Sequence, residues 1–257
     1  MSRYERPHIA FLHGLGGTPN QWISVMEECM PWADCFAPQL PWSWSNCYSW
    51  WGDIEDAEIA LCSAIAGYDV VVTHSFATSV MINALAAGKM AVPEALVFLA
   101  PLFRGHRSDF PFDEIERMLR TYQGCLVASL GNRIREPVNV PDLWAKARIA
   151  RAALGTGAWT AFLYAYVSTA ADRRLPSVPA LIIKGMYDRV SPRSDAQSLQ
   201  GALPGSLLLV GDFGHFPMLE RQEALAEMLH DGLCKLGVLT SAHENGHRND
   251  LQTRELS

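Results

Sequence analysis

The sequence has no dense block of charge of either sign. Its 257 residues carry 21 Lys and Arg against 27 Asp and Glu, which gives a net charge of −6. Proteins that bind nucleic acid or an anionic membrane surface through electrostatics concentrate Lys and Arg in one stretch or on one face. A small-molecule partner is therefore expected, with neither nucleic acid nor a membrane involved. The composition does not indicate an oligomeric state.

Long apolar runs and closely paired cysteines are also missing. No stretch reaches the roughly 18 apolar residues of a membrane-spanning helix. At the N-terminus, charge and proline interrupt any apolar run before it is long enough for a secretory signal. The six cysteines have no C-x-x-C spacing: Cys29, Cys35, Cys47, Cys62, Cys125 and Cys234. These absences predict a cytoplasmic protein with buried, reduced thiols and no metal site.

Short apolar runs alternate with segments of helical periodicity along most of the chain. Strands are expected at 8–14, 68–75, 94–101, 179–185 and 206–212, with a weaker candidate at 35–40. Helices are expected at 53–66, 76–88, 192–203 and 220–236. This alternation predicts an α/β fold, a mostly parallel central sheet flanked by helices, with about six strands.

The segment 103–176 interrupts the alternation because it is helical throughout. It is expected to form a helical cap over the carboxyl ends of the strands. The chain would then consist of an α/β core (1–102 and 177–238), the cap (103–176) and a polar C-terminal tail at 239–257, expected to be disordered.

Ligands of open parallel sheets bind at the carboxyl ends of the strands, so the residues that follow each strand are the informative ones. Ser75 ends the 68–75 run within the sequence T-H-S-F-A, immediately before the helix expected at 76–88. A nucleophilic serine on a sharp strand-to-helix turn needs small residues two positions before and after it, usually G-x-S-x-G. Here those positions are Thr73 and Ala77. The alternative is that Ser75 only caps the helix.

Three further loops follow strands. His13-Gly14-Leu15-Gly16-Gly17 could direct the Leu15 amide toward the Phe76 amide, so that both stabilise an oxyanion, or it could be a plain tight turn. Asp188 could orient a histidine, or could be a turn residue or helix cap. His215 lies past the last strand, free to approach Ser75, although a single histidine is more often structural.

Taken together, the motifs HGLGG (13–17), THSFA (73–77), GMYDRVSP (185–192) and GHFPMLE (214–220) resemble the α/β-hydrolase family over roughly residues 8–236. The resemblance implies Ser75 as nucleophile, Asp188 as the acid and His215 as the base. It also implies the amides of Leu15 and Phe76 as oxyanion donors. No cofactor or metal is required by this chemistry.

The substrate is less constrained by the sequence. Six of the eight tryptophans lie between residues 22 and 51, where they either seal the edge of the sheet or line an apolar acyl pocket. The residues expected to border the substrate are His13, Gly14, Trp44, Phe103, Trp159 and Phe162. Arg104 is expected to be a solvated hinge residue or a contact for a polar substrate group, and Lys184 a strand-end residue near the surface.

These features predict a serine hydrolase that cleaves a carboxylic ester or thioester of a small apolar substrate through an acyl-enzyme on Ser75. Two alternatives stay open. One is a lyase or carbon–carbon bond hydrolase that uses the same three residues. The other is a ligand-binding protein of receptor type, which would not need Ser75, Asp188 and His215 to be intact as a catalytic triad.

Overall fold

The computed structural model describes residues 6–46, 50, 53–106, 112–133, 139–169 and 174–239. Its centre is a six-stranded sheet in the order β2-β1-β3-β4-β5-β6, in which every neighbouring pair is parallel. The strands are β1 (His8–Leu12), β2 (Asp34–Phe36), β3 (Val70–His74), β4 (Ala95–Leu99), β5 (Ala180–Gly185) and β6 (Leu207–Gly211). The predicted α/β class and the expected number of strands are both confirmed.

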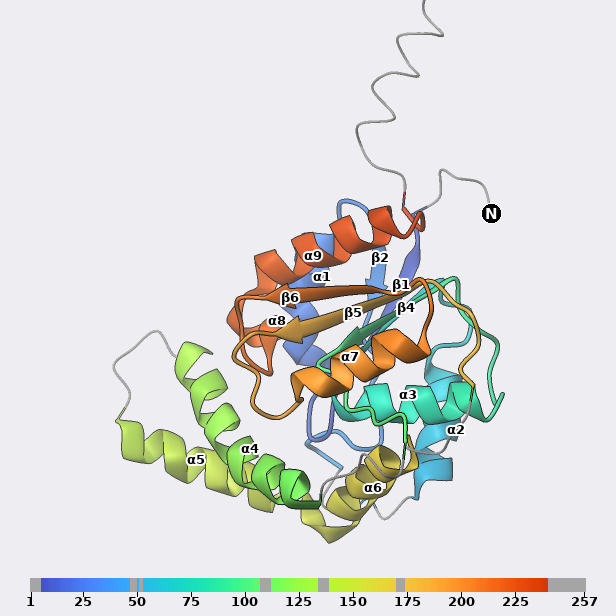
Figure 1. Ribbon diagram of the computed structural model, residues 1–257. Helices are drawn as coiled ribbons and strands as arrows, with labels where there is room; N and C mark the ends of the chain where they lie inside the picture. The colour runs from blue at the N-terminus through green and yellow to red at the C-terminus, as the bar shows by residue number, and fades with distance from the viewer. Residues whose placement is uncertain are drawn as a thin grey trace, which may run out of the picture.

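Helices cover both faces of the sheet (Figure 1). One face is covered by α1 (Ile23–Cys29) and α9 (Gln222–Lys235), and the other by α2 (Ile54–Ala64), α3 (Phe76–Ala86) and α7 (Arg193–Ala202). Two short elements, η1 (Pro19–Trp22) and α8 (Pro217–Glu220), precede α1 and α9. The sequence patterns did not predict η1, α1 or α8, each of which is seven residues or fewer.

The four inner strands, β1, β3, β4 and β5, are mostly apolar because side chains on both of their faces are buried, whereas the edge strands β2 and β6 are only partly buried. In β1, Ile9 and Phe11 join the core beneath α1 and α9, whereas Ala10 and Leu12 join the core beneath α2 and α3. This alternation follows from the two-residue period of a strand. It is also why an all-parallel sheet reads as continuous hydrophobic runs.

The strand order creates a crevice at the carboxyl ends of β1 and β3. The chain passes from β1 to β2 on one side, then returns to place β3 on the other side of β1. In parallel α/β sheets this switch in direction is where ligands bind. The 13–17 loop follows β1 and Ser75 follows β3, so both begin at this crevice.

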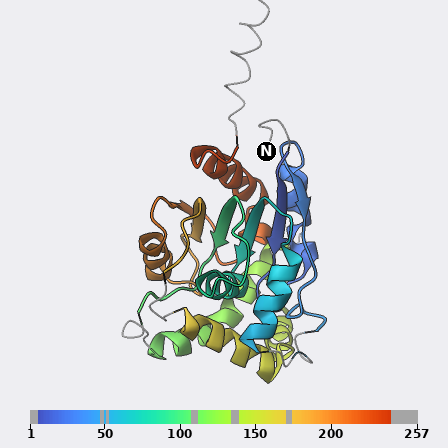
Figure 2. The same ribbon diagram turned by 90° about the vertical axis from the view of Figure 1, so that its right-hand side faces the viewer.

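Three helices are inserted between β4 and β5. They are α4 (Phe112–Arg133), α5 (Val140–Ala152) and α6 (Gly155–Ser168), and Figure 2 shows them grouped at one end of the sheet. The division of the chain into core and cap at residues 103 and 176 stays a prediction. The tail from residue 240 onward lies outside the described residues. Within the described ranges, no helix is long and apolar enough to cross a membrane.

Candidate active site

Ser75 occupies a strained turn between β3 and α3. Its φ of 53° and ψ of −116° lie where L-residues are rarely found, and its N–H donates to the Leu99 carbonyl on β4 over 3.0 Å. A conformation of this kind costs on the order of 1–3 kcal/mol and persists only where the surrounding structure enforces it. Such strain concentrates at functional sites, and a helix cap does not require it.

The two departures from the usual G-x-S-x-G pattern fit without disruption. Thr73 is fully buried, and its hydroxyl donates to the Val97 carbonyl on the neighbouring strand over 3.1 Å. Ala77 is fully buried on the first turn of α3. The hydroxyl of Thr73 therefore has a partner in the sheet, which explains how the larger residue is accommodated where glycine is common.

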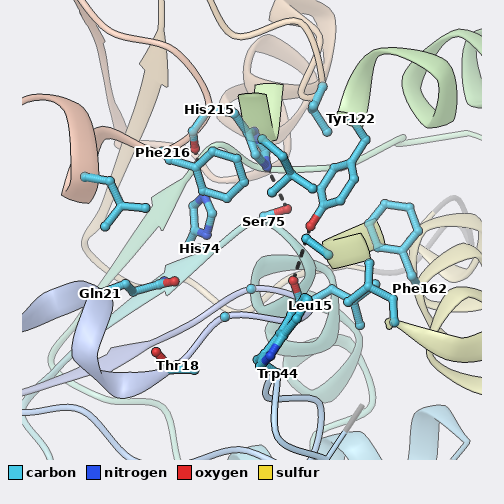
Figure 3. A pocket seen from close by; sticks show the side chains of 18 of the residues that line it. Leu15, Thr18, Gln21, Trp44, His74, Ser75, Tyr122, Phe162, His215 and Phe216 are labelled. Atoms are coloured by element: carbon cyan, nitrogen blue, oxygen red, sulfur yellow. Dashed lines mark hydrogen bonds between the residues drawn. The ribbon is translucent and has the colours of Figure 1, made fainter. Parts of the chain in front are cut away.

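Ser75, His215 and Asp188 form a continuous hydrogen-bonded chain. His215 Nε2 lies 3.1 Å from Ser75 Oγ, and His215 Nδ1 lies 2.9 Å from Asp188 Oδ2 (Figure 3 shows the first of these). All three residues are buried. The structure thus brings together the three residues that the sequence analysis grouped, from loops that follow β3, β5 and β6.

The Asp188 carboxylate is held in its charged form. Its Oδ1 accepts the N–H groups of Val190 and Ser191 over 2.8 and 3.0 Å. Burial opposes ionisation, but His215, Lys184 and the Ser191 N–H together outweigh it and lower the pKa of Asp188 below its ordinary value. A carboxylate at this position can fix the tautomer of His215 and stabilise its protonated form.

Lys184 corrects an expectation. It was expected near the surface, yet it is buried, and its ammonium donates to the carbonyls of Gly185 and Asp188 over 3.0 and 3.2 Å. Burial lowers the pKa of Lys184, while the Asp188 and Asp195 carboxylates act in the opposite direction. The side chain of Lys184 therefore holds the backbone of the loop that carries Asp188.

The 13–17 loop approaches the Ser75 turn closely. A Cβ on Gly14 would lie 3.0 Å from His74 Nδ1 and 3.1 Å from Ser75 Cβ, so a side chain there would force the loop outward. Among the described residues, the amides of Leu15 and Phe76 have no backbone acceptor. Neither N–H group is therefore committed to the backbone hydrogen bonding of the described residues.

A pocket of about 430 Å³ opens above Ser75 and His215. Of the residues expected to border the substrate, Gly14, Trp44, Trp159 and Phe162 line it, together with Leu15. Phe103 and His13 do not line it. Phe103 instead packs into the core beneath α6, and His13 accepts the Leu40 N–H at Nε2 over 3.2 Å.

Several lining residues were not anticipated. The segment inserted between β4 and β5 contributes Tyr122, Leu126, Ile149 and Leu154, and the region after β1 contributes Thr18 and Gln21. These residues carry no local motif, because their role depends on how α4 and α5 fold back over the sheet. In the sequence, the only indication that residues 103–176 contribute to the site was their expected role as a helical cap.

The tryptophans divide between the two interpretations. Trp22 and Trp42 are fully buried, and Trp42 donates its Nε1–H to the His13 carbonyl over 3.0 Å. Trp44 instead lines the pocket and is 41% exposed. Trp51 lies outside the described residues. One part of the cluster therefore builds the core and another part borders the site.

Arg104 departs from both of its expected roles. It is buried, its Nε lies 3.0 Å from Asp195 Oδ1 and 3.1 Å from the Tyr166 hydroxyl, and Tyr166 donates to Asp195 Oδ2 over 2.7 Å. This polar cluster joins the segment after β4 to α6 and α7. Arg104 is thus a structural residue that anchors the inserted helices.

The cysteines match the expectation in part. The five described cysteines are free thiols, but only Cys29 is buried and the others are half-buried. Cys47 lies outside the described residues. Across the described segments, no group of three or more His, Cys, Asp and Glu side chains could hold a metal ion.

Comparison with solved structures shows the same fold in several hydrolases. A 2-hydroxy-6-oxo-6-phenylhexa-2,4-dienoate hydrolase (BphD) from Rhodococcus sp. strain RHA1 is 18% identical, with a TM-score of 0.60 over 88% of this chain and 90% of that one. A thermophilic esterase from Thermogutta terrifontis is 18% identical, with a TM-score of 0.56 over 90% of each chain. A meta-cleavage product hydrolase, CumD, is 16% identical, with a TM-score of 0.60 over 90% of this chain and 92% of that one.

Sequence comparison gives the family directly. No curated protein sequence matches the chain. The model of the alpha/beta hydrolase family, however, matches residues 9–228, which is most of the chain. The matched segment runs from β1 into α9 and contains Ser75, Asp188 and His215. The chain belongs to the alpha/beta hydrolase family.

Proposed function

We propose that this protein is a serine hydrolase that cleaves a carboxylic ester or thioester of a small apolar substrate through an acyl-enzyme on Ser75. The observation that carries the proposal is the buried chain from Asp188 through His215 to Ser75 Oγ, with contacts of 2.9 and 3.1 Å, at the floor of a pocket. A serine hydroxyl is a weak nucleophile, and an adjacent oriented histidine is the usual means of activating it.

The reaction follows from these positions. His215 Nε2 accepts the Ser75 proton as Oγ attacks the acyl carbon, and the carbonyl electrons move onto the oxygen that the Leu15 and Phe76 amides receive. The tetrahedral species then collapses, and the leaving group takes the proton from His215. Water, activated by His215 in the same way, releases the acid and restores Ser75. Each oxyanion donor contributes about 3–4 kcal/mol in comparable enzymes.

The lining of the pocket supports an apolar acyl group. Trp44, Trp159 and Phe162 provide aromatic surface, and Leu126, Ile149 and Leu154 provide aliphatic surface. Most of these side chains come from α4, α5 and α6, so the inserted helices act as a cap whose removal would expose the site to water. Burial of apolar area is worth about 25 cal/mol per Å², which favours substrates that fill this space.

Carbon–carbon bond hydrolysis is the second candidate. Two structural neighbours, BphD and CumD, are named as hydrolases of a phenylhexadienoate and of a meta-cleavage product. At 18% and 16% identity, these two likenesses show the fold alone. Ester or thioester hydrolysis therefore remains the first candidate. A lyase would use His215 as a base without an acyl-enzyme. A ligand-binding role is the weakest candidate, because a receptor would not need the hydrogen-bonded chain of Asp188, His215 and Ser75 that is present here.

A cytoplasmic location is part of the proposal. The free thiols of the five described cysteines are typical of reducing compartments, where disulfides are rare. Recovery of the native protein in the cytosolic fraction, rather than in a secreted or periplasmic one, is the expected result.

Intact-protein mass spectrometry after incubation with a fluorophosphonate tests the nucleophile. A single adduct that maps to Ser75 and is lost in Ser75→Ala is expected. Ser79→Ala, which lies one helical turn further along α3, is the matched control and should still be labelled. A folded wild-type protein that remains unlabelled would remove the support for an activated serine.

A substrate panel then separates the reaction classes. It would contain p-nitrophenyl esters, acyl thioesters and a phenylhexadienoate of the type named for BphD. Turnover of esters or thioesters at rates well above that of the dienoate is expected. The reverse preference would move carbon–carbon hydrolysis ahead of the ester reaction.

A further inference from the structure

His74 connects the nucleophile turn to the loop that carries His215. It directly precedes Ser75, is only 1% exposed, and its Nε2 lies 2.8 Å from the backbone carbonyl oxygen of His215. Its ring packs against the rings of His215 and Phe216, with centroids 5.0 and 5.6 Å away. Figure 3 shows the His74 ring beneath Phe216 and beside Ser75.

The contacts of His74 define its tautomer. Because a carbonyl oxygen only accepts hydrogen bonds, the proton of His74 must be on Nε2, and Nδ1 is then unprotonated. Nδ1 is buried without a hydrogen-bond partner in the described structure, and it faces Gly14, where even a Cβ would lie only 3.0 Å away. A second proton on Nδ1 would be a buried donor without an acceptor. Burial, followed by the nearby His215, accordingly lowers the pKa of His74 to about 3.

The His215 loop is held at several backbone groups. Glu220 accepts the N–H groups of Gly214 and Phe216 over 2.6 and 3.1 Å, on either side of His215. His74 binds the carbonyl of His215 itself. These contacts fix the backbone from which the His215 ring reaches Ser75 Oγ.

We propose that His74 is a positioning residue, whose Nε2–H holds the His215 carbonyl and thereby sets the contact between His215 Nε2 and Ser75 Oγ. The inference rests on the proposed function for its catalytic consequence, but not for its geometry. His74 does not exchange protons in the reaction, since it stays neutral. Without its hydrogen bond, His215 would spend less time within reach of Ser75, and misplacement by about 1 Å can cost about 100-fold in rate.

A packing role alone makes a different prediction, and three substitutions separate the two. His74→Gln can present an amide N–H near the position of Nε2, whereas the shorter His74→Asn matches Nδ1 and cannot reach the His215 carbonyl. His74→Phe keeps a ring of similar shape and removes the donor. If only packing mattered, Phe would be the best replacement and Gln would have no advantage over Asn.

The experiment measures kcat and KM with p-nitrophenyl butyrate, the rate of fluorophosphonate labelling, and thermal unfolding for each variant. We expect His74→Phe and His74→Asn to lower kcat and the labelling rate by about 10- to 100-fold, with KM changed less than about threefold. His74→Gln should recover most of that loss. A ranking with Phe close to wild type, or three equal losses that follow thermal stability, overturns the proposal.

Histidine NMR spectra keep the test independent of turnover. If the wild-type protein neither hydrolyses esters nor reacts with fluorophosphonate, the proposed function fails, yet the His215 Nδ1–H signal can still be followed. That proton should give a sharp downfield resonance in wild type and His74→Gln and a broadened or shifted one in His74→Phe. An unchanged resonance in all variants rules out the positioning role.

Discussion

His13 accepts the backbone N–H of Leu40 at Nε2 over 3.2 Å, while its Nδ1 lies 2.9 Å from the Gly14 carbonyl. The first contact requires Nε2 to be unprotonated and the second requires a proton on Nδ1. A second proton would therefore oppose the Leu40 N–H directly. His13 is thus a neutral residue that holds the start of the 13–17 loop, as His74 holds the backbone beside Ser75.

Acid should weaken the fold through these two histidines. Burial lowers the pKa of His13 to about 4 and that of His74 to about 3, from 6.5. At pH values between the folded-state pKa of each histidine and 6.5, the unfolded chain binds more protons than the folded chain. The free energy of unfolding therefore falls as pH drops below about 6.5. For His13 alone the loss from pH 7 to pH 5 is on the order of 2 kcal/mol. Urea unfolding at both pH values measures it.

The histidine origin of that loss can be isolated by substitution. His13→Gln keeps an acceptor for Leu40 and cannot titrate, so it should reduce the difference between the two pH values. His230→Gln, at a half-buried position on α9, is the matched control for the substitution itself. Equal pH dependence in His13→Gln and wild type would contradict this assignment.

Replacing Asp188 by Asn should disable catalysis without removing the side chain. The amide cannot stabilise protonated His215 and favours the wrong tautomer, which costs about 10⁴-fold in kcat in comparable triads. Asp212→Asn changes an exposed carboxylate just before the same histidine loop and is expected to leave kcat within about threefold of wild type. Ester hydrolysis by Asp188→Asn within tenfold of wild type would argue against this role.

The buried cluster of Arg104, Asp195 and Tyr166 should stabilise the attachment of α6. Asp195→Asn removes a charged partner of Arg104 and is expected to cost about 3 kcal/mol in the free energy of unfolding. Tyr166→Phe removes a neutral donor to Asp195 and should cost about 1–2 kcal/mol. Tyr164→Phe, at an exposed position on the same helix, is the control. Chemical denaturation measures these free energies of unfolding. Equal values for all three variants would show that the cluster contributes little to stability.

Trp44 should influence acyl selectivity. It is 41% exposed and lines the pocket, while Trp144 on α5 is 47% exposed and does not line it. Trp44→Ala is expected to change the ratio of kcat/KM between long and short p-nitrophenyl esters by about tenfold, because apolar contact with the longer chain is lost. Trp144→Ala should leave that ratio unchanged. The same ratio in both variants would exclude a role for Trp44 in the acyl pocket.

The sequence was most informative about features that depend on local patterns, such as apolar runs and the residues that directly follow them. Apolar runs and the residues that follow them could be read directly, so the α/β fold and the grouping of Ser75, Asp188 and His215 were both predictable. The strained φ of Ser75 became visible only in the structure, because a serine between a strand and a helix could equally be an ordinary helix cap. Parallel strands bring their carboxyl ends to one edge, and the resemblance to the α/β-hydrolase family supplied the role of each of these distant residues.

Residues whose role depends on tertiary packing were not predictable. Arg104 looked solvated because its partner Asp195 lies far along the chain on α7, and Lys184 looked exposed because its acceptors are backbone carbonyls. Tyr122 lines the pocket because of where α4 packs, which no local pattern in the sequence indicates. Sequence patterns describe periodicity and local turns, whereas ion pairs between separate elements require the assembled fold.

The most direct test of the central claim is to observe the acyl-enzyme. Wild-type protein would be mixed with excess p-nitrophenyl butyrate, quenched in acid at early times, and analysed by intact-mass and peptide mass spectrometry. We expect one butyryl group on Ser75 that forms as p-nitrophenol is released and is absent in Ser75→Ala. Continued turnover without an adduct on Ser75, or with the acyl group on another residue, would contradict it.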